Sequence, residues 1–262
     1  MRVTLVQMNV RAGDLHGNFD QAYKGISVAA QRESTVVLLP EMWTTGFTPH
    51  MHTLARDTYN QAVSFLSAAA KESKVWVLGS LPEAVGSCLY NTLYYFAPTG
   101  DLAATYRKTH LFAPMHETDY FSPGNEVKTV EMAGWQAGGM ICFDLRFPEL
   151  GRRLVLAGAQ VVFVPAQFPH PRSEHWHVLL RARAIENQYY VVACNRVGES
   201  DGLTFFGGST VIDPWGNVVT ALDDRPDIVT VDLHRPLVEE ARTRLAVLPA
   251  RRPDIYGDCQ PQ

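Results

Sequence analysis

Apolar and polar positions along the chain follow two alternating patterns. Short runs of mostly β-branched and aliphatic residues, such as 35–39, are typical of buried strands, whereas segments such as 18–32 and 58–72 repeat apolar residues at helical spacing. This alternation is typical of βαβ units, in which helices cover a largely parallel sheet, and it predicts an α/β fold. The expected strands are 3–9, 35–39, 75–80, 89–97, 102–107, 137–142, 160–164, 189–195, 205–212, 218–222 and 227–233, and the further expected helices are 147–157 and 173–187.

Two features interrupt this pattern in the first half of the chain. The turn sequence Pro-Thr-Gly at 98–100 lies between the strands 89–97 and 102–107, so we expect an antiparallel hairpin there. A polar segment from about 109 to 126 follows, and we expect it to form a long loop. Loops of this length inside a compact domain are commonly functional.

Two strands in different halves of the chain resemble each other. TVVLLPE (35–41) and QVVFVPA (160–166) are both buried strands that end at a proline. The pattern favours two similar α/β halves whose sheets pack face to face, although it is also an ordinary way for a buried parallel strand to end. We expect one domain over 1–240 and a basic, proline-containing tail over 241–262.

Composition and charge exclude several classes of protein. Lys and Arg number 23 against 27 Asp and Glu, which gives a net charge of −4 and argues against nucleic-acid binding. We expect no signal peptide or membrane anchor, because the apolar runs are too short to span a bilayer. Cys88, Cys142, Cys194 and Cys259 form no CxxC pair, so neither a zinc ribbon nor a disulfide framework is indicated and a cytoplasmic location fits best.

Three reactive side chains are expected at the ends of predicted strands. Glu41 follows 35–39, Lys108 follows 102–107 and Cys142 ends 137–142. Because the carboxyl ends of parallel strands share one edge of a sheet, these groups can form an activated-nucleophile site with a thiol nucleophile, a carboxylate base and a cation for the oxyanion. Each residue alone also fits a plainer role, Cys142 as a small buried hydrophobe and the other two as loop charges.

The segments around these residues resemble the three signature segments of the carbon–nitrogen hydrolase (nitrilase) superfamily. The matching segments are LLPEMWTTGF (38–47), YRKTHLF (106–112) and GGMICFDLRFPEL (138–150). The resemblance extends from residue 3 to about residue 235. Through CFDLRFPE (142–149) and PHPRSEHW (169–176), it is closest to the ω-amidase and deaminated-glutathione-amidase branches.

This resemblance implies a fold, an assembly and a catalytic triad. The expected fold is a four-layer αββα sandwich, usually paired through its helices into a homodimer. The triad falls on Glu41, Lys108 and Cys142, and Glu117 is at the position of a second glutamate that is often present. Lys108 and the backbone N–H of Phe143 are the expected oxyanion donors, and the chemistry needs neither a cofactor nor a metal.

The remaining candidates concern the substrate. Arg146, four residues after Cys142, is suited to bind a carboxylate, and Phe168 and Arg172 lie on a loop that we expect to enter the site. The leading hypothesis is a thiol amidohydrolase of a small carboxylated amide, such as 2-oxoglutaramate, with no nucleic-acid or membrane partner. The alternatives are an amidase for deaminated glutathione or an N-carbamoyl amide, and a catalytically idle binding protein with the same fold.

Overall fold

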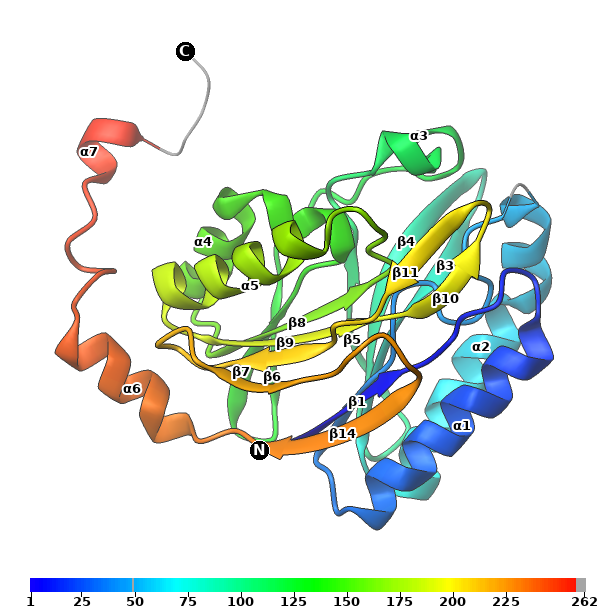
Figure 1. Ribbon diagram of the computed structural model, residues 1–262, viewed down its shortest axis with the longest axis horizontal. Helices are drawn as coiled ribbons and strands as arrows, with labels where there is room; N and C mark the ends of the chain where they lie inside the picture. The colour runs from blue at the N-terminus through cyan, green and yellow to red at the C-terminus, as the bar shows by residue number, and fades with distance from the viewer. Residues whose placement is uncertain (49, 258–262) are drawn as a thin grey trace.

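Two six-stranded sheets form the centre of the molecule in the computed structural model, which describes residues 1–48 and 50–257 (Figure 1). The first sheet contains, in spatial order, β14 (Asp227–Asp232), β1 (Arg2–Gln7), β2 (Val36–Leu38), β3 (Trp76–Val85), β4 (Cys88–Phe96) and β5 (Leu102–Arg107). The second contains β13 (Val218–Ala221), β12 (Thr210–Ile212), β9 (Tyr190–Asn195), β8 (Val161–Ala166), β7 (Trp135–Gly139) and β6 (Thr129–Met132).

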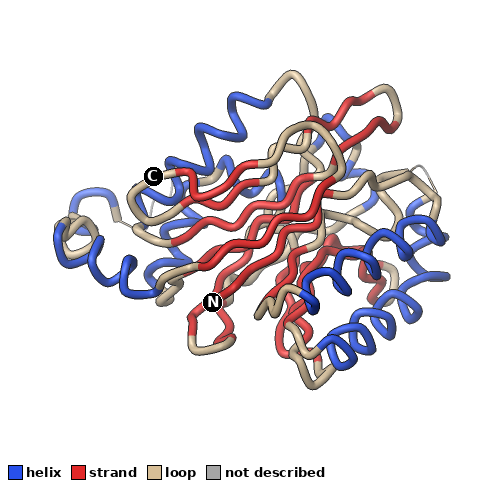
Figure 2. Tube along the Cα trace, turned by 60° about the horizontal axis from the view of Figure 1, so that its bottom comes forward, coloured by secondary structure: helices blue, strands red, loops and turns tan. Residues whose placement is uncertain are grey.

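Helices cover the outer face of each sheet. The helices α1 (Leu15–Gln31) and α2 (Met51–Ser73) pack on the first sheet, and α4 (Pro148–Leu156) and α5 (Ser173–Asn187) pack on the second (Figures 1 and 2). The order of layers is therefore helix, sheet, sheet, helix, which confirms the expected αββα sandwich. The remaining elements are η1 (Ala113–Met115), α3 (Glu117–Tyr120), η2 (Cys142–Arg146), β10 (Val197–Ser200), β11 (Leu203–Phe206), α6 (Arg235–Arg244) and α7 (Pro253–Tyr256).

The two sheets share one plan. In the first sheet β1, β2 and β3 are parallel, and in the second β7, β8 and β9 are parallel. In the first sheet, the antiparallel strand β14 lies on one side of the parallel trio, and β4 and β5 lie on the other. In the second sheet, β6 lies on one side of the trio, and β12 and β13 lie on the other. The similar segments 35–41 and 160–166 lie at β2 and β8, the middle strands of the two trios, so their likeness reflects equivalent places in two similar halves.

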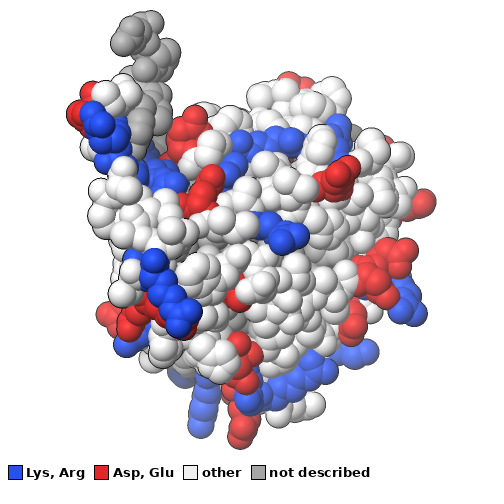
Figure 3. All heavy atoms as spheres, turned by 60° about the vertical axis from the view of Figure 1, so that its left-hand side comes forward, with Lys and Arg blue, Asp and Glu red and all other residues white. Residues whose placement is uncertain are grey.

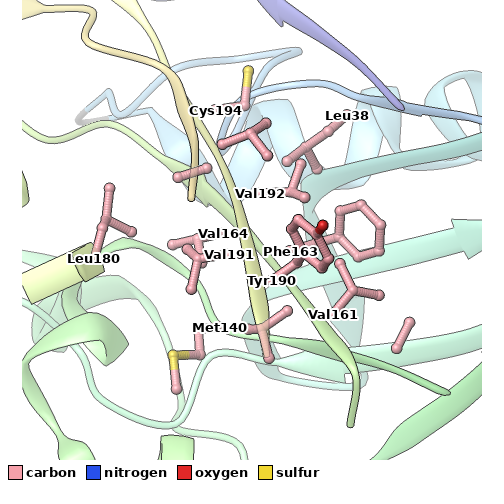
Figure 4. Packing of buried hydrophobic residues seen from close by; sticks show 14 of the residues in the cluster. Leu38, Met140, Val161, Phe163, Val164, Leu180, Tyr190, Val191, Val192 and Cys194 are labelled. Atoms are coloured by element: carbon pink, nitrogen blue, oxygen red, sulfur yellow. The ribbon is translucent and has the colours of Figure 1, made fainter. Parts of the chain in front are cut away.

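Alternation along the strands divides the core between the layers. Leu38 packs toward the second sheet, whereas Val37 and Leu39 belong to the cluster beneath α1 and α2. In the second sheet, Phe163 lies on the side of Leu38, and Val164 lies on the side of Leu180 of α5 (Figure 4). Both faces of the central strands are thus buried, which explains why these strands are continuous apolar runs in the sequence.

The structure departs from the expected elements in several places. The expected strand 137–142 ends at Gly139, so Cys142 begins η2 instead of ending a strand, and β10, α6 and α7 were not expected. The expected strand 205–212 is interrupted at Gly207 and Gly208, where φ is +66° and +68°. Left-handed backbone ends strand pairing, so β11 pairs with β10 in a separate hairpin and only β12 joins the sheet. The segment 109–126 contains η1 and α3 rather than a continuous loop, and β6 was not expected.

The expected boundary between domain and tail does not coincide with the end of an element. Residue 240, the expected domain boundary, lies inside α6, whose Val238 and Ala241 are buried. Acidic and basic side chains are interspersed over a largely uncharged surface on the face shown in Figure 3. Among the described helices, none combines the length and apolar character needed to cross a membrane.

Candidate active site

Four chain segments meet where strands of the two sheets end. Glu41 comes shortly after β2 and Lys108 directly after β5, and both belong to the first sheet. Cys142 comes shortly after β7 and Gln167 directly after β8 in the second sheet. Because hydrogen bonds join Glu41 to both Lys108 and Gln167, the site is built across the two sheets.

Lys108 lies between two buried carboxylates. Its Nζ is 2.8 Å from Oε1 of Glu41 and 2.6 Å from Oε1 of Glu117, and all three side chains are at most 1% exposed. Glu41 Oε1 also accepts from Nδ2 of Asn91 on β4, and Glu41 Oε2 accepts from the backbone N–H of Gln167, both at 2.8 Å. An ammonium group has three N–H donors, so one remains for a substrate oxygen.

The buried charges shift one another's protonation. Burial by itself lowers the pKa of Lys108, but the carboxylates of Glu117 and Glu41 raise it above its usual value. Burial raises the pKa of Glu117 to about 7, against the opposing effect of the Lys108 ammonium. Lys108 therefore stays charged, while Glu117 titrates near neutral pH.

Cys142 is the first residue of η2, shortly after β7, and its backbone is strained. Its φ of +47° lies in the left-handed region that residues with a side chain seldom adopt, a kind of strain that concentrates at functional sites. Burial raises the pKa of its thiol well above the usual value; Glu41 and Glu117 raise it further, and Lys108 opposes them. The thiol is thus protonated at rest and needs a base. The N–H of Phe143 belongs to the first turn of η2, where helical N–H groups lack partners within the helix.

Asp144 fixes this turn to the segment that carries Lys108. The Asp144 carboxylate, which is completely buried, accepts from the hydroxyl of Tyr106 at 2.7 Å, from the N–H of His110 at 2.9 Å and from the N–H of Ile141 at 3.0 Å. A ring nitrogen of His110 lies 2.8 Å from the same carboxylate. Because Lys108 lies between Tyr106 and His110, Asp144 sets its position relative to Cys142.

A narrow pocket opens beside the thiol. It is lined by Phe112, Cys142, Phe143, Arg146, Gln167, Phe168, Pro169 and Arg172. Its cavity volume is about 10 Å³, about the space of one water molecule and far below the roughly 300–1,000 Å³ of pockets for drug-sized ligands. The structure thus brings Phe143, Arg146, Phe168 and Arg172, all expected from the sequence, to one pocket with Cys142.

Two arginines make this pocket cationic. The guanidinium of Arg146 lies 5.5 Å from the ring centre of Phe168, and that of Arg172 lies 5.3 Å from the ring centre of Phe112. Burial and the charge of Arg172 lower the pKa of Arg146. Within the described residues neither arginine forms an ion pair with a carboxylate. Nη2 of Arg146 instead lies 3.2 Å from Nδ1 of His175.

Sequence reasoning missed several residues of this site. Asn91 and Gln167 lie in none of the matching segments, and Asp144 and His175 lie in the segments 142–149 and 169–176 but were not singled out there. A partial signal existed for Gln167, because it directly follows the strand that resembles the one before Glu41. The described His, Cys, Asp and Glu side chains form no group of three or more that could hold a metal ion.

Comparison with known proteins agrees with this geometry. The family model of carbon–nitrogen hydrolases matches residues 2–243. A 2-oxoglutaramate amidase of Bacillus subtilis is 36% identical over 256 residues, which cover 97% of this chain and 98% of that protein. The crystal structure of XC1258 from Xanthomonas campestris, a CN-hydrolase superfamily protein with an arsenic adduct in the active site, has a TM-score of 0.90 at 32% identity and covers 96% of this chain and 97% of that one.

A further structure concerns the active-site thiol of a relative. In a mutant of the amidase from Nesterenkonia sp. AN1, the acetamide moiety of fluoroacetamide is covalently added at the active site cysteine. That structure has a TM-score of 0.89 at 27% identity and covers 98% of this chain and 95% of that one. With the family match spanning nearly the whole sequence and the shared fold, the chain belongs to the carbon–nitrogen hydrolase family.

Proposed function

We propose that the protein is an ω-amidase, a thiol amidohydrolase that cleaves the amide of a small carboxylated substrate such as 2-oxoglutaramate, giving 2-oxoglutarate and ammonia. The observation that carries this proposal is the pocket in which the Cys142 thiol lies beside the two arginines, Arg146 and Arg172. The name of the Bacillus subtilis relative, a 2-oxoglutaramate amidase, supports the same substrate.

The first half of the reaction forms a thioester. Glu41 accepts the proton of the Cys142 thiol as the sulfur attacks the amide carbonyl carbon. The remaining N–H of Lys108 and the backbone N–H of Phe143 donate to the oxyanion that develops on the carbonyl oxygen. Glu41 then passes the proton to the amide nitrogen, the C–N bond breaks and ammonia leaves.

The second half releases the acid. Glu41 takes a proton from a water molecule, which attacks the thioester carbonyl, and the same two donors hold the new oxyanion. The C–S bond breaks, and the sulfur recovers its proton from Glu41. Glu117 binds Lys108 throughout and keeps its ammonium group directed at the reacting carbonyl.

The arginines select the substrate. A guanidinium binds a carboxylate through two parallel hydrogen bonds, and the low polarity of the surrounding phenylalanine rings strengthens this interaction. Arg146 and Arg172 would hold the end of the substrate that does not react, so that its amide end reaches Cys142. Phe168 forms an apolar wall of the same space.

An ammonia-release screen tests the proposal. The substrates are 2-oxoglutaramate, 2-oxosuccinamate, deaminated glutathione, N-carbamoyl amino acids, glutamine and simple nitriles, and Cys142→Ala is the control. We expect the highest kcat/KM with a 2-oxo acid amide and no turnover in the variant. Highest activity with deaminated glutathione or an N-carbamoyl compound would select that alternative, and no ammonia from any substrate would favour an idle binding protein.

The assembly and location are part of the same proposal. We propose a homodimer that pairs through α5, because Val178 and Ile185 on its outer side are 58% and 48% exposed. A cytoplasmic location is supported by Cys88, Cys142 and Cys194, which are all unpaired; Cys259 lies outside the described residues.

A further inference from the structure

Arg196 is a buried cation next to the proposed active site. It directly follows β9, its exposed fraction is 0%, and within the described part of the chain it forms no ion pair with a carboxylate. Its guanidinium donates to Oε1 of Gln167 and to the backbone oxygen of Val197, both at 3.1 Å, and lies 4.2 Å from the ring centre of Phe205. Burial lowers its pKa to about 10, against the opposing charge of Asp201.

Such a residue is costly for the fold alone. Removing a charge from water without an opposite charge carries a large penalty, and an apolar side chain of similar length usually fills the same space at lower cost. The hydrogen bonds of Arg196 are to neutral oxygens, which only partly offset that cost. Its side-chain partners are Oε1 of Gln167 at 3.1 Å and, more weakly, Oδ1 of Asn9 at 3.5 Å. The position of Gln167, which contacts Glu41, therefore indicates what the arginine does.

Gln167 contacts Glu41 at both ends. Its backbone N–H donates to Oε2 of the Glu41 carboxylate at 2.8 Å, and its side-chain Nε2 donates to the Glu41 backbone oxygen at 2.9 Å. The remaining atom of the Gln167 amide, Oε1, is the one that accepts from Arg196. The guanidinium thus determines which way the amide faces, because only this orientation presents Nε2 to Glu41.

Asn195, which precedes Arg196, binds Phe168, which follows Gln167. Asn195 accepts from the N–H of Phe168 at 2.7 Å and donates to its backbone oxygen at 3.0 Å. Asn195, the last residue of β9, therefore holds Phe168, and Arg196, which follows it, holds Gln167. Gln167 and Phe168 are the two residues that directly follow β8. Asn195 fixes a wall of the pocket, and Arg196 fixes the contact with Glu41.

We propose that Arg196 is a positioning residue for the general base: it orients Gln167, and Gln167 holds the carboxylate and the backbone of Glu41 in place for proton transfer from Cys142. This inference rests on the proposed function, in which Glu41 is the base. Arg196 itself touches neither the substrate nor the reacting atoms.

A double-mutant cycle with Arg196→Met and Gln167→Met tests the proposal. Methionine is similar in length to glutamine and replaces the arginine with an unbranched apolar side chain, and Gln167→Met retains the backbone N–H that binds Glu41. The first readout is the rate at which iodoacetamide alkylates Cys142, followed by mass spectrometry across pH 5–10, which needs no substrate. The second is kcat and KM with 2-oxoglutaramate.

We expect each single variant to lose roughly 10- to 100-fold in the alkylation rate at neutral pH and in kcat, because small misplacements of a catalytic group have effects of this size. KM should stay within about threefold, since Arg146 and Arg172 are unchanged. The double variant should lose no more than the worse single variant, because both changes break one connection. Up to pH 10 the rates of the variants should stay below that of the wild type, because burial keeps the pKa of the Cys142 thiol well above its usual value and the thiol still needs Glu41 to lose its proton.

Arg242→Met is the matched control. Arg242 also has a lowered pKa owing to burial, and it donates to the backbone oxygens of Gln188 and Ala159, which precede β9 and β8 at the opposite edge of the sheet. This variant should lose thermal stability and keep the wild-type pH profile. A wild-type profile in Arg196→Met, or additive losses in the double variant, would overturn the proposal.

The two proposals fail in different ways. If the wild type hydrolyses none of the amides but the Cys142 alkylation profile changes in Arg196→Met as described, the proposed function fails and the positioning role stands. If the wild type hydrolyses 2-oxoglutaramate and Arg196→Met leaves both the profile and kcat unchanged, the positioning role fails alone.

Discussion

At the scale of single residues, the charges around Cys142 explain why the thiol needs a base. With both carboxylates ionised, Lys108, Glu41 and Glu117 sum to −1 in a region with almost no exposure to water. A thiolate formed by releasing a proton to solvent would raise this to −2, which burial disfavours. Transfer of the proton from Cys142 to Glu41 leaves the total unchanged, so the site favours attack and proton transfer together.

The same charges predict how stability depends on pH. The pKa of Glu117 rises from an ordinary 4.5 to about 7 on folding, chiefly through burial, so the folded protein binds more protons than the unfolded chain between these values. Stability therefore falls as pH rises from 4.5 to 7, by about 3 kcal/mol for a shift of this size. Urea denaturation at a series of pH values measures the slope, which Glu117→Gln should abolish.

Glu83 provides the comparison for this measurement. Burial by itself raises the pKa of Glu83, but hydrogen bonds from Arg107 and Thr92 leave this pKa below the usual value. Glu83 therefore titrates below the range of pH 4.5 to 7. Glu83→Gln should retain the slope between pH 4.5 and 7. A wild-type slope that persists in Glu117→Gln would show that another group is responsible.

Arg146 decides whether the pocket recognises a carboxylate. Bidentate, charge-assisted hydrogen bonds contribute on the order of 2–4 kcal/mol, including the cost of leaving the substrate carboxylate without its partner. Arg146→Ala should therefore lower kcat/KM for 2-oxoglutaramate by roughly 30- to 1000-fold. Arg146→Lys should recover little, because an ammonium lacks the planar fork. Steady-state kinetics with a neutral amide of similar size is the control. Equal losses on both substrates would instead indicate a structural role, through the contact with His175.

At the scale of elements, the nucleophile turn depends on a partner from another strand. The turn η2 begins at Cys142, and its Asp144 accepts hydrogen bonds from Tyr106 on β5 and from His110 just beyond it. The segments that carry Lys108 and Cys142 are thereby joined through one carboxylate. No local sequence signal reveals this pairing, because Asp144 lies 38 residues from Tyr106 in the sequence.

Replacing this carboxylate should therefore affect both stability and catalysis. Asp144→Asn places an amide N–H₂ against donors, so at least one buried N–H or O–H loses its acceptor, at a cost of about 1–3 kcal/mol. We expect a lower denaturation midpoint in urea and a reduced kcat per folded molecule. Asp223→Asn, which changes an exposed carboxylate beside Arg225, should alter neither quantity appreciably. Unchanged kcat in Asp144→Asn would limit Asp144 to the fold.

Elements with one strong periodicity could be predicted, and elements set by tertiary contacts could not. The middle strands β2 and β8 are short apolar runs, and α5 was expected with the bounds it has, 173–187. In contrast, Gly207 and Gly208 look like ordinary glycines in the sequence, and only their positive φ shows that they separate β11 from β12. The burial of Glu117 is likewise hidden, because its neighbours in the segment 109–126 are polar.

At the scale of the whole molecule, the site joins the two similar halves. The first half supplies Glu41, Lys108 and Glu117, and the second supplies Cys142 and Gln167. Periodicity places Glu41, Lys108, Cys142 and Gln167 near strand ends but not Glu117, and it does not indicate which edge of one sheet faces which edge of the other. The resemblance to carbon–nitrogen hydrolases singled out Glu41, Lys108 and Cys142 as the proposed triad, whereas the hydrogen bonds through Gln167 required the folded chain.

The outer face of α5 predicts how copies of the molecule associate. Val178 and Ile185 are seven residues apart and so lie on one side of the helix, and Ile185 abuts the turn at Gly216 next to the partly exposed Trp215. Apolar side chains grouped in this way on an outer helix are typical of protein–protein contacts. We therefore expect a dimer at micromolar concentration, measured by analytical ultracentrifugation.

Charge introduced on this face should separate the dimer. In Val178→Glu/Ile185→Glu, the two-fold pairing would bring like charges together without partners, so the variant should sediment as a folded monomer. Tyr23→Glu is the matched control, because Tyr23 is 50% exposed on α1, at the opposite outer layer, and its replacement should leave the dimer intact. A monomeric wild type, or a double variant that remains dimeric, would refute pairing through α5. Because the active site lies at the strand ends and not on this helix face, the separated monomer should retain a measurable kcat, which distinguishes loss of association from loss of folding.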